Sequence, residues 1–189
     1  MLMQKMSLRA RGLTGGFVRD KGASAAVEFA VIVPIMLTLF FGVIEFSSGV
    51  AVDRKVTLVA RTLSDLTSQS SCVTDALLTD FTNTGKAIMT PYSTTPLHST
   101  ITQLYVDPAT STAKVKWSKG TAPRGTGTTV SIPAALLIDD TYLIYSEVDY
   151  KYVPTVGYVM AKAGVTLSDY TFTRPRQSTS VTYKATSCS

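Results

Sequence analysis

Residues 29–44 read FAVIVPIMLTLFFGVI, and no residue in this run is charged. Extending the run back to Ala23 gives 22 residues with a single charge, the carboxylate of Glu28. An α-helix needs about 20 mainly apolar residues to cross the hydrocarbon core of a bilayer. Membrane helices also tolerate an internal proline such as Pro34 better than soluble helices do. We therefore predict a transmembrane helix over residues 23–46.

Basic residues dominate the segment before this helix. They are Lys5, Arg9, Arg11, Arg19 and Lys21, against one acid, Asp20. The positive-inside rule predicts that residues 1–22 are a cytosolic basic leader and that the chain after the helix is exported. A cleaved secretory signal peptide is the alternative, but its apolar core is usually about 7–15 residues long. A retained helix fits this longer run better, and it predicts a single-pass inner-membrane protein with a periplasmic C-terminal domain.

The helical pattern continues beyond the membrane segment as an amphipathic extension, predicted over residues 47–70. Apolar residues recur there at spacings of four, three, four and three, on one face of a helix. They are Val52, Val56, Val59, Leu63 and Leu66. One continuous helix over residues 24–68 would be roughly 68 Å long at 1.5 Å per residue. Its second half would offer an apolar stripe to a globular domain.

Residues 71–189 are predicted to form the exported domain. A second helix is expected over residues 74–89, capped by Thr74 and buried through Leu77, Phe81 and Ile88. Strands are expected at residues 99–106, 113–118, 141–152 and 165–173. In the second of these, Val115 and Trp117 alternate with polar residues, which predicts one buried face. The predicted fold class is α+β, with the long N-terminal helix packed on a small antiparallel sheet.

The two cysteines, Cys72 and Cys188, show no spacing typical of a zinc site. In an exported domain they could form one disulfide, and the alternative is two unpaired thiols. The net charge of +5 is spread along polar segments and forms no nucleic-acid footprint. We predict no metal site, no cofactor and no nucleic-acid partner.

No group of residues has the spacing of an active site. His98 is the only histidine, in a Ser/Thr/Pro-rich stretch that we interpret as a loop. We interpret the acid pair Asp139–Asp140 as part of a turn. We interpret Glu147 and Asp149 as residues on the solvent-exposed face of a strand. We therefore expect no enzyme activity, no catalytic residues and no small-molecule substrate.

Hydropathy does not explain the presence of Glu28, because placing a carboxylate just inside a membrane costs a few kcal/mol of insertion free energy. Glu28 could lie at the headgroup level and stay hydrated. It could instead meet a partner from another chain. If a peptidase cut the chain just before the helix, the new α-ammonium group of one subunit could pair with Glu28 of its neighbour. Such pairing would set the axial register of subunits in a helical assembly.

The stretch KGASAAVEFAVIVPIMLTLFFGVIEF, residues 21–46, resembles the N-terminus of TadE-like minor pilins, or pseudopilins, of tight-adherence (Tad) pilus systems. The resemblance covers roughly residues 20–61 and includes VEFA, the membrane-centred Pro34 and GVIEF. It implies a type IVb-pilin-like motif, in which a prepilin peptidase cuts after a glycine and an acid–aromatic pair begins at the fifth mature position. Glu28 and Phe29 match that pair.

The processing site that the resemblance implies is Gly22 or Ala23. Cleavage after Gly22 makes Glu28 the sixth mature residue, whereas cleavage after Ala23 makes it the fifth. Both bonds remain open at this point, as does the absence of cleavage.

The resemblance implies a role in assembly of a Tad-type (Flp) pilus. The exported domain is larger than that of the family's major pilin, which favours a minor pilin. The implied partners are the lipid bilayer, the prepilin peptidase, other pilins and Tad assembly proteins. From the residues alone, an unprocessed membrane-anchored envelope or adhesion domain is the alternative.

Overall fold

The computed structural model describes residues 21–154 and 164–188, with side chains described from Ala25 onward. The chain divides into two compact units between Ser47 and Ser48. Helix α2, Lys21–Ser68, runs through this boundary. It contains the segment predicted at 23–46 and ends two residues before the end of the extension predicted at 47–70. Pro34 lies inside the helix, and the Thr38 hydroxyl donates to its carbonyl at 2.8 Å.

The second unit contains a five-stranded antiparallel sheet with the strand order β4-β3-β2-β5-β6. The strands are β2 (Leu97–Asp107), β3 (Thr112–Gly120), β4 (Thr129–Val130), β5 (Tyr142–Tyr152) and β6 (Val165–Thr173). A short parallel pair joins β1 (Cys72–Val73) to β7 (Thr182–Tyr183). The described residues of this unit also form the helix α3 (Asp75–Ile88) and a 3₁₀ turn, η1 (Ala134–Leu136). The predicted α+β class is confirmed.

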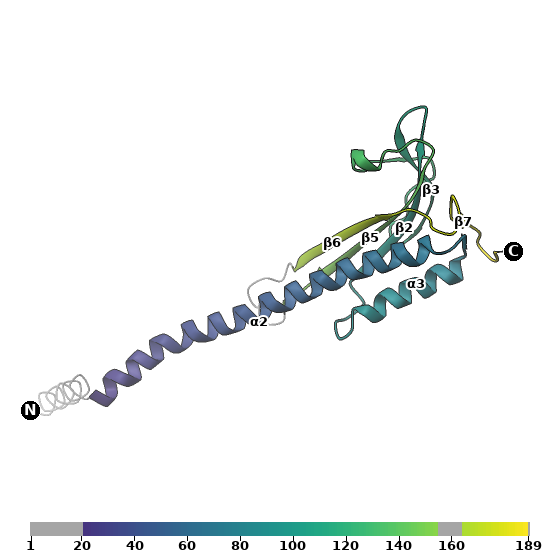
Figure 1. Cartoon of the computed structure of the whole chain (residues 1–189). Coiled ribbons are helices and arrows are strands. Elements are labelled where there is room, and N and C mark those ends of the chain that lie inside the picture. Colours follow the sequence, from purple (N-terminus) through teal and green to yellow (C-terminus); the bar gives the residue numbers. More distant parts are fainter. Residues whose placement is uncertain (1–20, 155–163, 189) are drawn as a thin grey trace, which may run out of the picture. The chain divides into compact units, whose positions relative to one another are not determined.

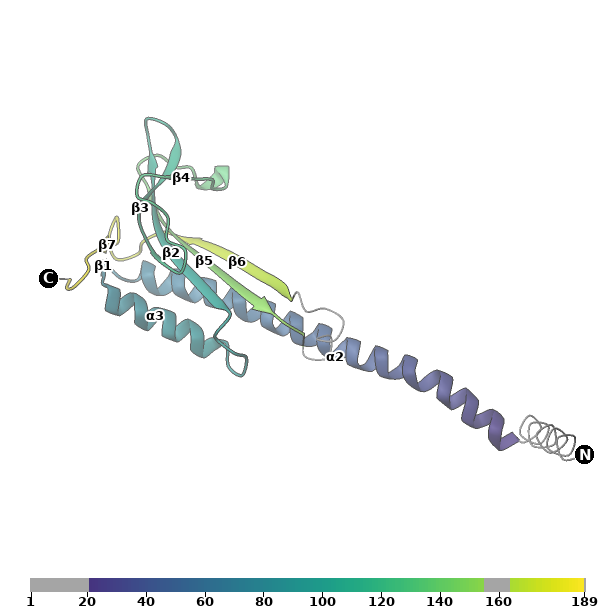
Figure 2. The ribbon, with the colours of Figure 1, turned by 180° about the vertical axis from the view of Figure 1, so that it is seen from behind.

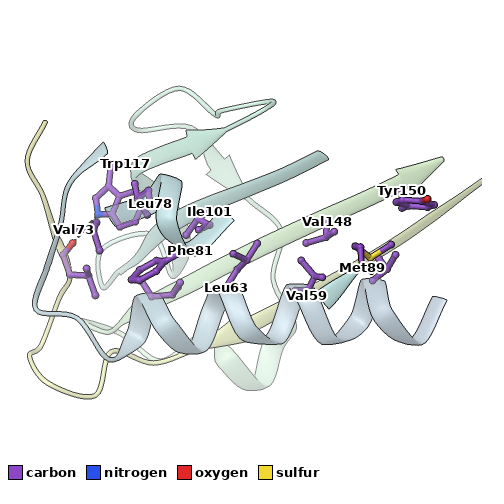
Figure 3. Close-up of a cluster of buried hydrophobic side chains, with 14 of the residues drawn as sticks. Val59, Leu63, Val73, Leu78, Phe81, Met89, Ile101, Trp117, Val148 and Tyr150 are labelled. Carbon is purple, nitrogen blue, oxygen red and sulfur yellow. Dashed lines mark hydrogen bonds between the residues drawn. The ribbon is translucent and has the colours of Figure 1, made fainter. Parts of the chain in front are cut away.

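Within this unit, α3 and the C-terminal part of α2 lie on the same side of the sheet, as Figures 1 and 2 show from opposite directions. The apolar stripe predicted from the helical spacing forms the inner core. Val52, Val56, Val59 and Leu63 are fully buried, and Leu66 packs against them partly exposed. Side chains of α2, α3 and the sheet point toward one another in this core (Figure 3). The stripe is therefore confirmed as the face that packs on the sheet.

Helix α3 begins where its predicted cap lies, because the Thr74 hydroxyl accepts the backbone N–H of Leu77 at 3.2 Å. Phe81 is buried as predicted, but Leu78 is more deeply buried than Leu77 or Ile88. The buried face of α3 is therefore rotated from the predicted one, so that Leu78 takes the place expected for Leu77. Gly85 explains this rotation, since a Cβ there would lie 3.0 Å from a methyl group of Val59. The glycine lets α3 approach α2 closely.

Lys55 of α2 binds the C-terminal end of α3. Its ammonium group donates to the carbonyl of Ile88 at 2.7 Å and to that of Thr90 at 2.9 Å. The last carbonyls of a helix have no partner within the helix, and a cation there is favourable.

We expect Lys55→Met to lower the free energy of unfolding by about 1 kcal/mol, because both charge-assisted bonds are lost. Urea denaturation of the full-length protein in detergent measures this change. Lys151→Met is the matched control, since Lys151 is an exposed strand lysine. Its effect should stay within about 0.5 kcal/mol. Equal effects of the two substitutions would contradict the bridging role of Lys55.

The opposite face of the sheet has a second core, which the alternating pattern did not predict. Its buried members are Leu104, Val106, Ala113, Val115, Leu143 and Tyr145. Trp117 pairs with Gln103, and Val115 pairs with the adjacent Leu104, so Lys116 is an extra residue that makes a β-bulge. The bulge places Val115 in this second core, which we call the outer core, while Trp117 belongs to the inner core between the sheet and the helices. Both are buried, but the prediction that they share one face was wrong.

Candidate functional site

The first part of α2 presents apolar side chains all around its surface. They are Val27, Phe29, Val31, Ile32, Ile35, Met36, Leu37, Leu39, Phe40, Phe41, Val43, Ile44 and Phe46, with 40–74% of each exposed. A helix that is apolar on every side requires cover by lipid or by other apolar surfaces. Among the described residues, one helix is long and apolar enough to cross a membrane by length and composition, and it is this one. We identify it as the candidate membrane anchor.

The residues of the predicted processing motif lie in this helix. Gly22 and Ala23 directly follow Lys21, the first described residue of α2. Glu28 and Phe29 lie about two turns after Lys21 and are exposed on the helix surface. The whole motif therefore lies on one continuous helical segment. A carboxylate is thus exposed on the surface that lipid or other helices must cover.

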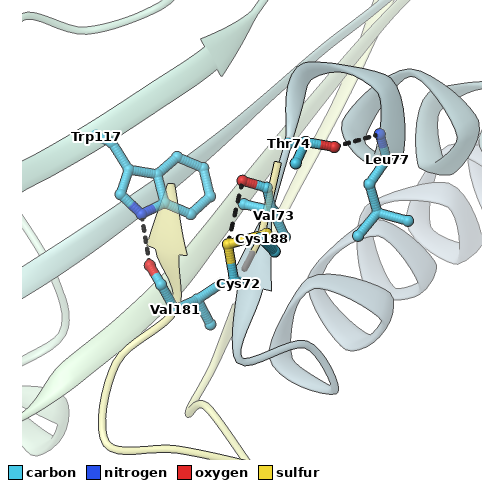
Figure 4. Close-up of a disulfide and its surroundings, with 7 residues drawn as sticks. All are labelled: Cys72, Val73, Thr74, Leu77, Trp117, Val181 and Cys188. Carbon is cyan, nitrogen blue, oxygen red and sulfur yellow. Dashed lines mark hydrogen bonds between the residues drawn. A yellow bond between two sulfur atoms is a disulfide. The ribbon is translucent and has the colours of Figure 1, made fainter. Parts of the chain in front are cut away.

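Cys72 and Cys188 are joined by a disulfide, with their Cα atoms 5.8 Å apart (Figure 4). The bond connects residues 116 positions apart in the sequence. It lies beside the parallel pairing of β1 with β7, in which Cys72 is opposite Thr182. The disulfide and the β1–β7 pairing therefore both join the segment just after α2 to the C-terminal segment.

Trp117 docks the C-terminal segment on the sheet. Its indole N–H donates to the carbonyl of Val181 at 2.8 Å, and Val181 is fully buried in the inner core (Figure 4). The Tyr183 hydroxyl donates to the Asp75 carboxylate at 2.9 Å, and Lys119 lies 4.4 Å from the Tyr183 ring. Nothing in the local pattern after residue 176 indicated this docking. The apolar–polar alternation of Val181 and Tyr183 is too short to be a signal by itself.

Two of the four acids considered as paired carboxylates, Glu147 and Asp140, have other partners. Arg124 forms a two-point ion pair with Glu147, and the Tyr145 hydroxyl donates to Glu147 at 2.8 Å. Burial raises the pKa of Tyr145, although the positive charge of Arg124 opposes this. Asp140 accepts the Tyr105 hydroxyl at 3.0 Å in the turn before β5, and this bond raises the pKa of Tyr105.

The structure places His98 in β2, opposite Asp149 in the strand register, and not in a loop. The prediction of a loop was wrong because β2 begins earlier than its apolar alternation indicates. In the described parts of the chain, no three His, Cys, Asp or Glu side chains are grouped so that they could hold a metal ion.

The described residues of the second unit line at least two hollows. One, about 240 Å³, lies between α3 and strands β2 and β3, beside Lys86 and Lys119. A second, about 380 Å³, lies between α2 and β6, beside Arg61 and Thr171.

Comparison with known proteins gives one finding at the N-terminal helix. Residues 23–64 match the family model described as TadE-like protein. The matched segment is under a quarter of the 189 residues and lies entirely within α2. No curated protein and no solved structure matches the chain. The match confirms the resemblance that VEFA, Pro34 and GVIEF indicated.

Proposed function

From the TadE-like match over residues 23–64, we propose that this protein is a minor pilin, or pseudopilin, that takes part in the assembly of a Tad-type (Flp) pilus. The proposal rests on one observation, which is that the family match, the exposed apolar surface and Glu28 all lie in the same helical segment. The matched segment contains the exposed apolar helix and the carboxylate of Glu28. The proposed location is the inner membrane, with the N-terminus cytoplasmic and the exported domain periplasmic.

The same apolar surface supports both stages of such a role. Before assembly it is covered by lipid, and in a filament it is covered by the helices of other pilins. Full burial of one large apolar side chain contributes about 1.5–3 kcal/mol relative to water. Because lipid and neighbouring helices are similarly apolar, transfer between them has no large hydrophobic cost. A polar contact is then needed to select one packing register.

Glu28 supplies that contact in the proposed assembly. Cleavage by a prepilin peptidase after Gly22 would place the new α-ammonium group on Ala23, and cleavage after Ala23 would place it on Ser24. At 1.5 Å per residue, this group lies roughly 6–8 Å from Glu28 along the helix of its own chain. Pairing with a neighbour's Glu28 would therefore offset adjacent subunits by about that distance. In a low-dielectric surrounding the attraction is strong.

We further propose that the exported domain acts by binding and not by catalysis. Two of the residues that could have served catalysis are engaged elsewhere, because Cys72 is in a disulfide and Glu147 is paired with Arg124. The proposed partners are the bilayer, the prepilin peptidase, other pilins and Tad assembly proteins.

N-terminal sequencing of the protein extracted from membranes tests this function. We expect a mature chain that starts at Ala23 or Ser24 and is about 2 kDa lighter than the precursor, because the leader is removed. The first residue read decides between the two bonds. A Gly22→Lys variant is the matched control, and it should accumulate at precursor size if the peptidase cuts after Gly22.

The alternatives give different sequences in the same experiment. An intact Met1 would overturn the processing and favour an unprocessed membrane-anchored envelope or adhesion domain. A first residue at Val50 or later would indicate a secretory signal peptide.

A further inference from the structure

The outer side of β6 is a free strand edge. β6 pairs with β5 from Val165 to Thr173 and ends the strand order, and no other strand in the described ranges pairs with it. Exposed edges are usually protected by short length, proline or lysine. The nine residues of β6 include neither proline nor lysine, and Asp169 is their only charge. The edge is thus open to an added strand.

A groove of about 380 Å³ lies beside the C-terminal half of this edge. Its walls are Thr171 and Thr173 of β6 and, from α2, Arg61, Asp65 and Leu66. Figures 1 and 2 both show β6 running alongside α2. Because Thr171 and Thr173 belong to β6 and also line the groove, the groove borders the strand edge.

Small residues hold α2 close under this edge. The Ser64 hydroxyl donates to the Thr173 hydroxyl at 2.8 Å, and the Ser146 hydroxyl of β5 donates to the Ala60 carbonyl at 2.6 Å. Thr171 is the β6 partner of Ser146, so Thr171 is level with Ala60. Arg61, the next residue of α2, then borders the groove beside Thr171.

The groove is lined by two positive side chains, Arg61 and Arg176, and by one negative side chain, Asp65. Asp65 forms an ion pair with Arg176 at 2.7 Å, and the backbone N–H of Arg176 is held by the Ser68 carbonyl. Arg61 is exposed and forms no ion pair with any described residue. One positive charge is therefore left without a counterpart. An incoming side chain that reaches Arg61 should be acidic.

We propose that β6 and this groove bind an extended segment of a different protein, which adds to the sheet as an antiparallel strand. An added strand lies about 4.8 Å from its neighbour, and every second side chain faces the same side of the sheet. Those facing α2 enter the groove. The bound segment has an acidic residue opposite Thr171, where it meets Arg61, and an apolar residue two positions away, where it meets Leu66.

A second copy of this chain fits the surface less well. β6 runs in the same direction as α2, because Ala60 is level with Thr171 and Ser64 with Thr173. Antiparallel pairing of two β6 strands would make the two adjacent α2 segments antiparallel, which does not suit two chains anchored in one membrane as the proposed function requires. The opposite edge strand of the sheet, β4, has only two residues, Thr129–Val130, and is too short to pair along the nine residues of β6.

A peptide titration of the full-length protein in lipid nanodiscs tests the proposal without any pilus component. The probe is a fluorescent peptide of about nine residues, alternating threonine and valine with one central aspartate. A matched peptide has lysine at that position. A third has aspartate but N-methylated backbone amides, which lack the N–H donors that a complete strand pairing requires. We expect the aspartate peptide to bind about tenfold more tightly than either of the others.

Arg61→Glu should reverse the preference, so that the lysine peptide binds more tightly. Arg54→Glu is the matched control, because Arg54 is an exposed arginine of α2 outside the groove, and it should leave the preference unchanged. Equal binding of the N-methylated peptide would overturn strand addition. A preference unchanged by Arg61→Glu would overturn the charge contact. Sedimentation showing a dimer that the aspartate peptide dissociates would assign the edge to a second copy and overturn the proposed partner.

Discussion

Replacing Cys188 with serine should lower the free energy of unfolding of the second unit, which begins at Ser48, by about 4–5 kcal/mol. The bond with Cys72 spans 116 residues, and a cross-link over such a long loop removes much of the conformational freedom of the unfolded chain. The loss is large against the roughly 5–15 kcal/mol that stabilises a typical domain. It should also loosen the docking of Val181 on Trp117, because the C-terminal segment is then held only by the short β1–β7 pair and its side-chain contacts.

Urea denaturation of the full-length protein, followed by tryptophan fluorescence, measures this effect. Trp117 is the only tryptophan and is buried beside Val181, so its emission reports directly on the docked state. The double variant Cys72→Ser/Cys188→Ser is the control, and it should be no less stable than Cys188→Ser, because both remove the same bond. A non-reducing gel should show a mobility shift on reduction for the wild type only. No shift, together with a loss below about 1 kcal/mol, would show that the bond contributes little.

Glu28→Gln should leave membrane insertion intact and abolish incorporation of the protein into pili. Glutamine keeps the size and polarity of the side chain, and removing a charge from the membrane segment makes insertion more favourable. The proposed pairing with a neighbour's α-ammonium group needs the negative charge. Without it, the apolar helices have no contact that selects one register. The expected loss of incorporation is therefore near complete.

Membrane fractionation and immunodetection in sheared pilus preparations measure the two properties separately. Asp53→Asn is the matched control, since Asp53 is an exposed carboxylate of the same helix beyond the apolar run. It should be inserted and incorporated normally. Glu28→Asp keeps the charge on a shorter side chain and should restore part of the incorporation. Normal amounts of Glu28→Gln in pili would refute the register-setting role.

Much of the architecture could be predicted because it depends on local periodicity. The spacing of Val52, Val56, Val59 and Leu63 indicated the buried face of α2 without any knowledge of the sheet. Thr74 likewise marked the start of α3, because a cap satisfies the backbone of its own helix. The apolar run before these residues indicated the anchor, since length and hydropathy alone determine whether a helix can span a bilayer.

Other features depend on residues far apart in the chain, and no local pattern contains them. The β-bulge at Lys116 is defined only relative to β2, so alternation within β3 placed Val115 and Trp117 on one face. The outer core and the Arg124–Glu147 ion pair arise when the loop after β3 folds over β5.

The sequence by itself thus determined the membrane-length helix, its amphipathic continuation and the acid–aromatic pair Glu28–Phe29, because each is a property of one contiguous helical segment. Only the tertiary structure decided that Cys72 meets Cys188, that Trp117 holds the C-terminal segment, and that β6 forms a free edge above a groove beside Arg61. The physical reason is that these contacts join distant residues, and the strand register and the close seating of α2 under the sheet decide which of them meet.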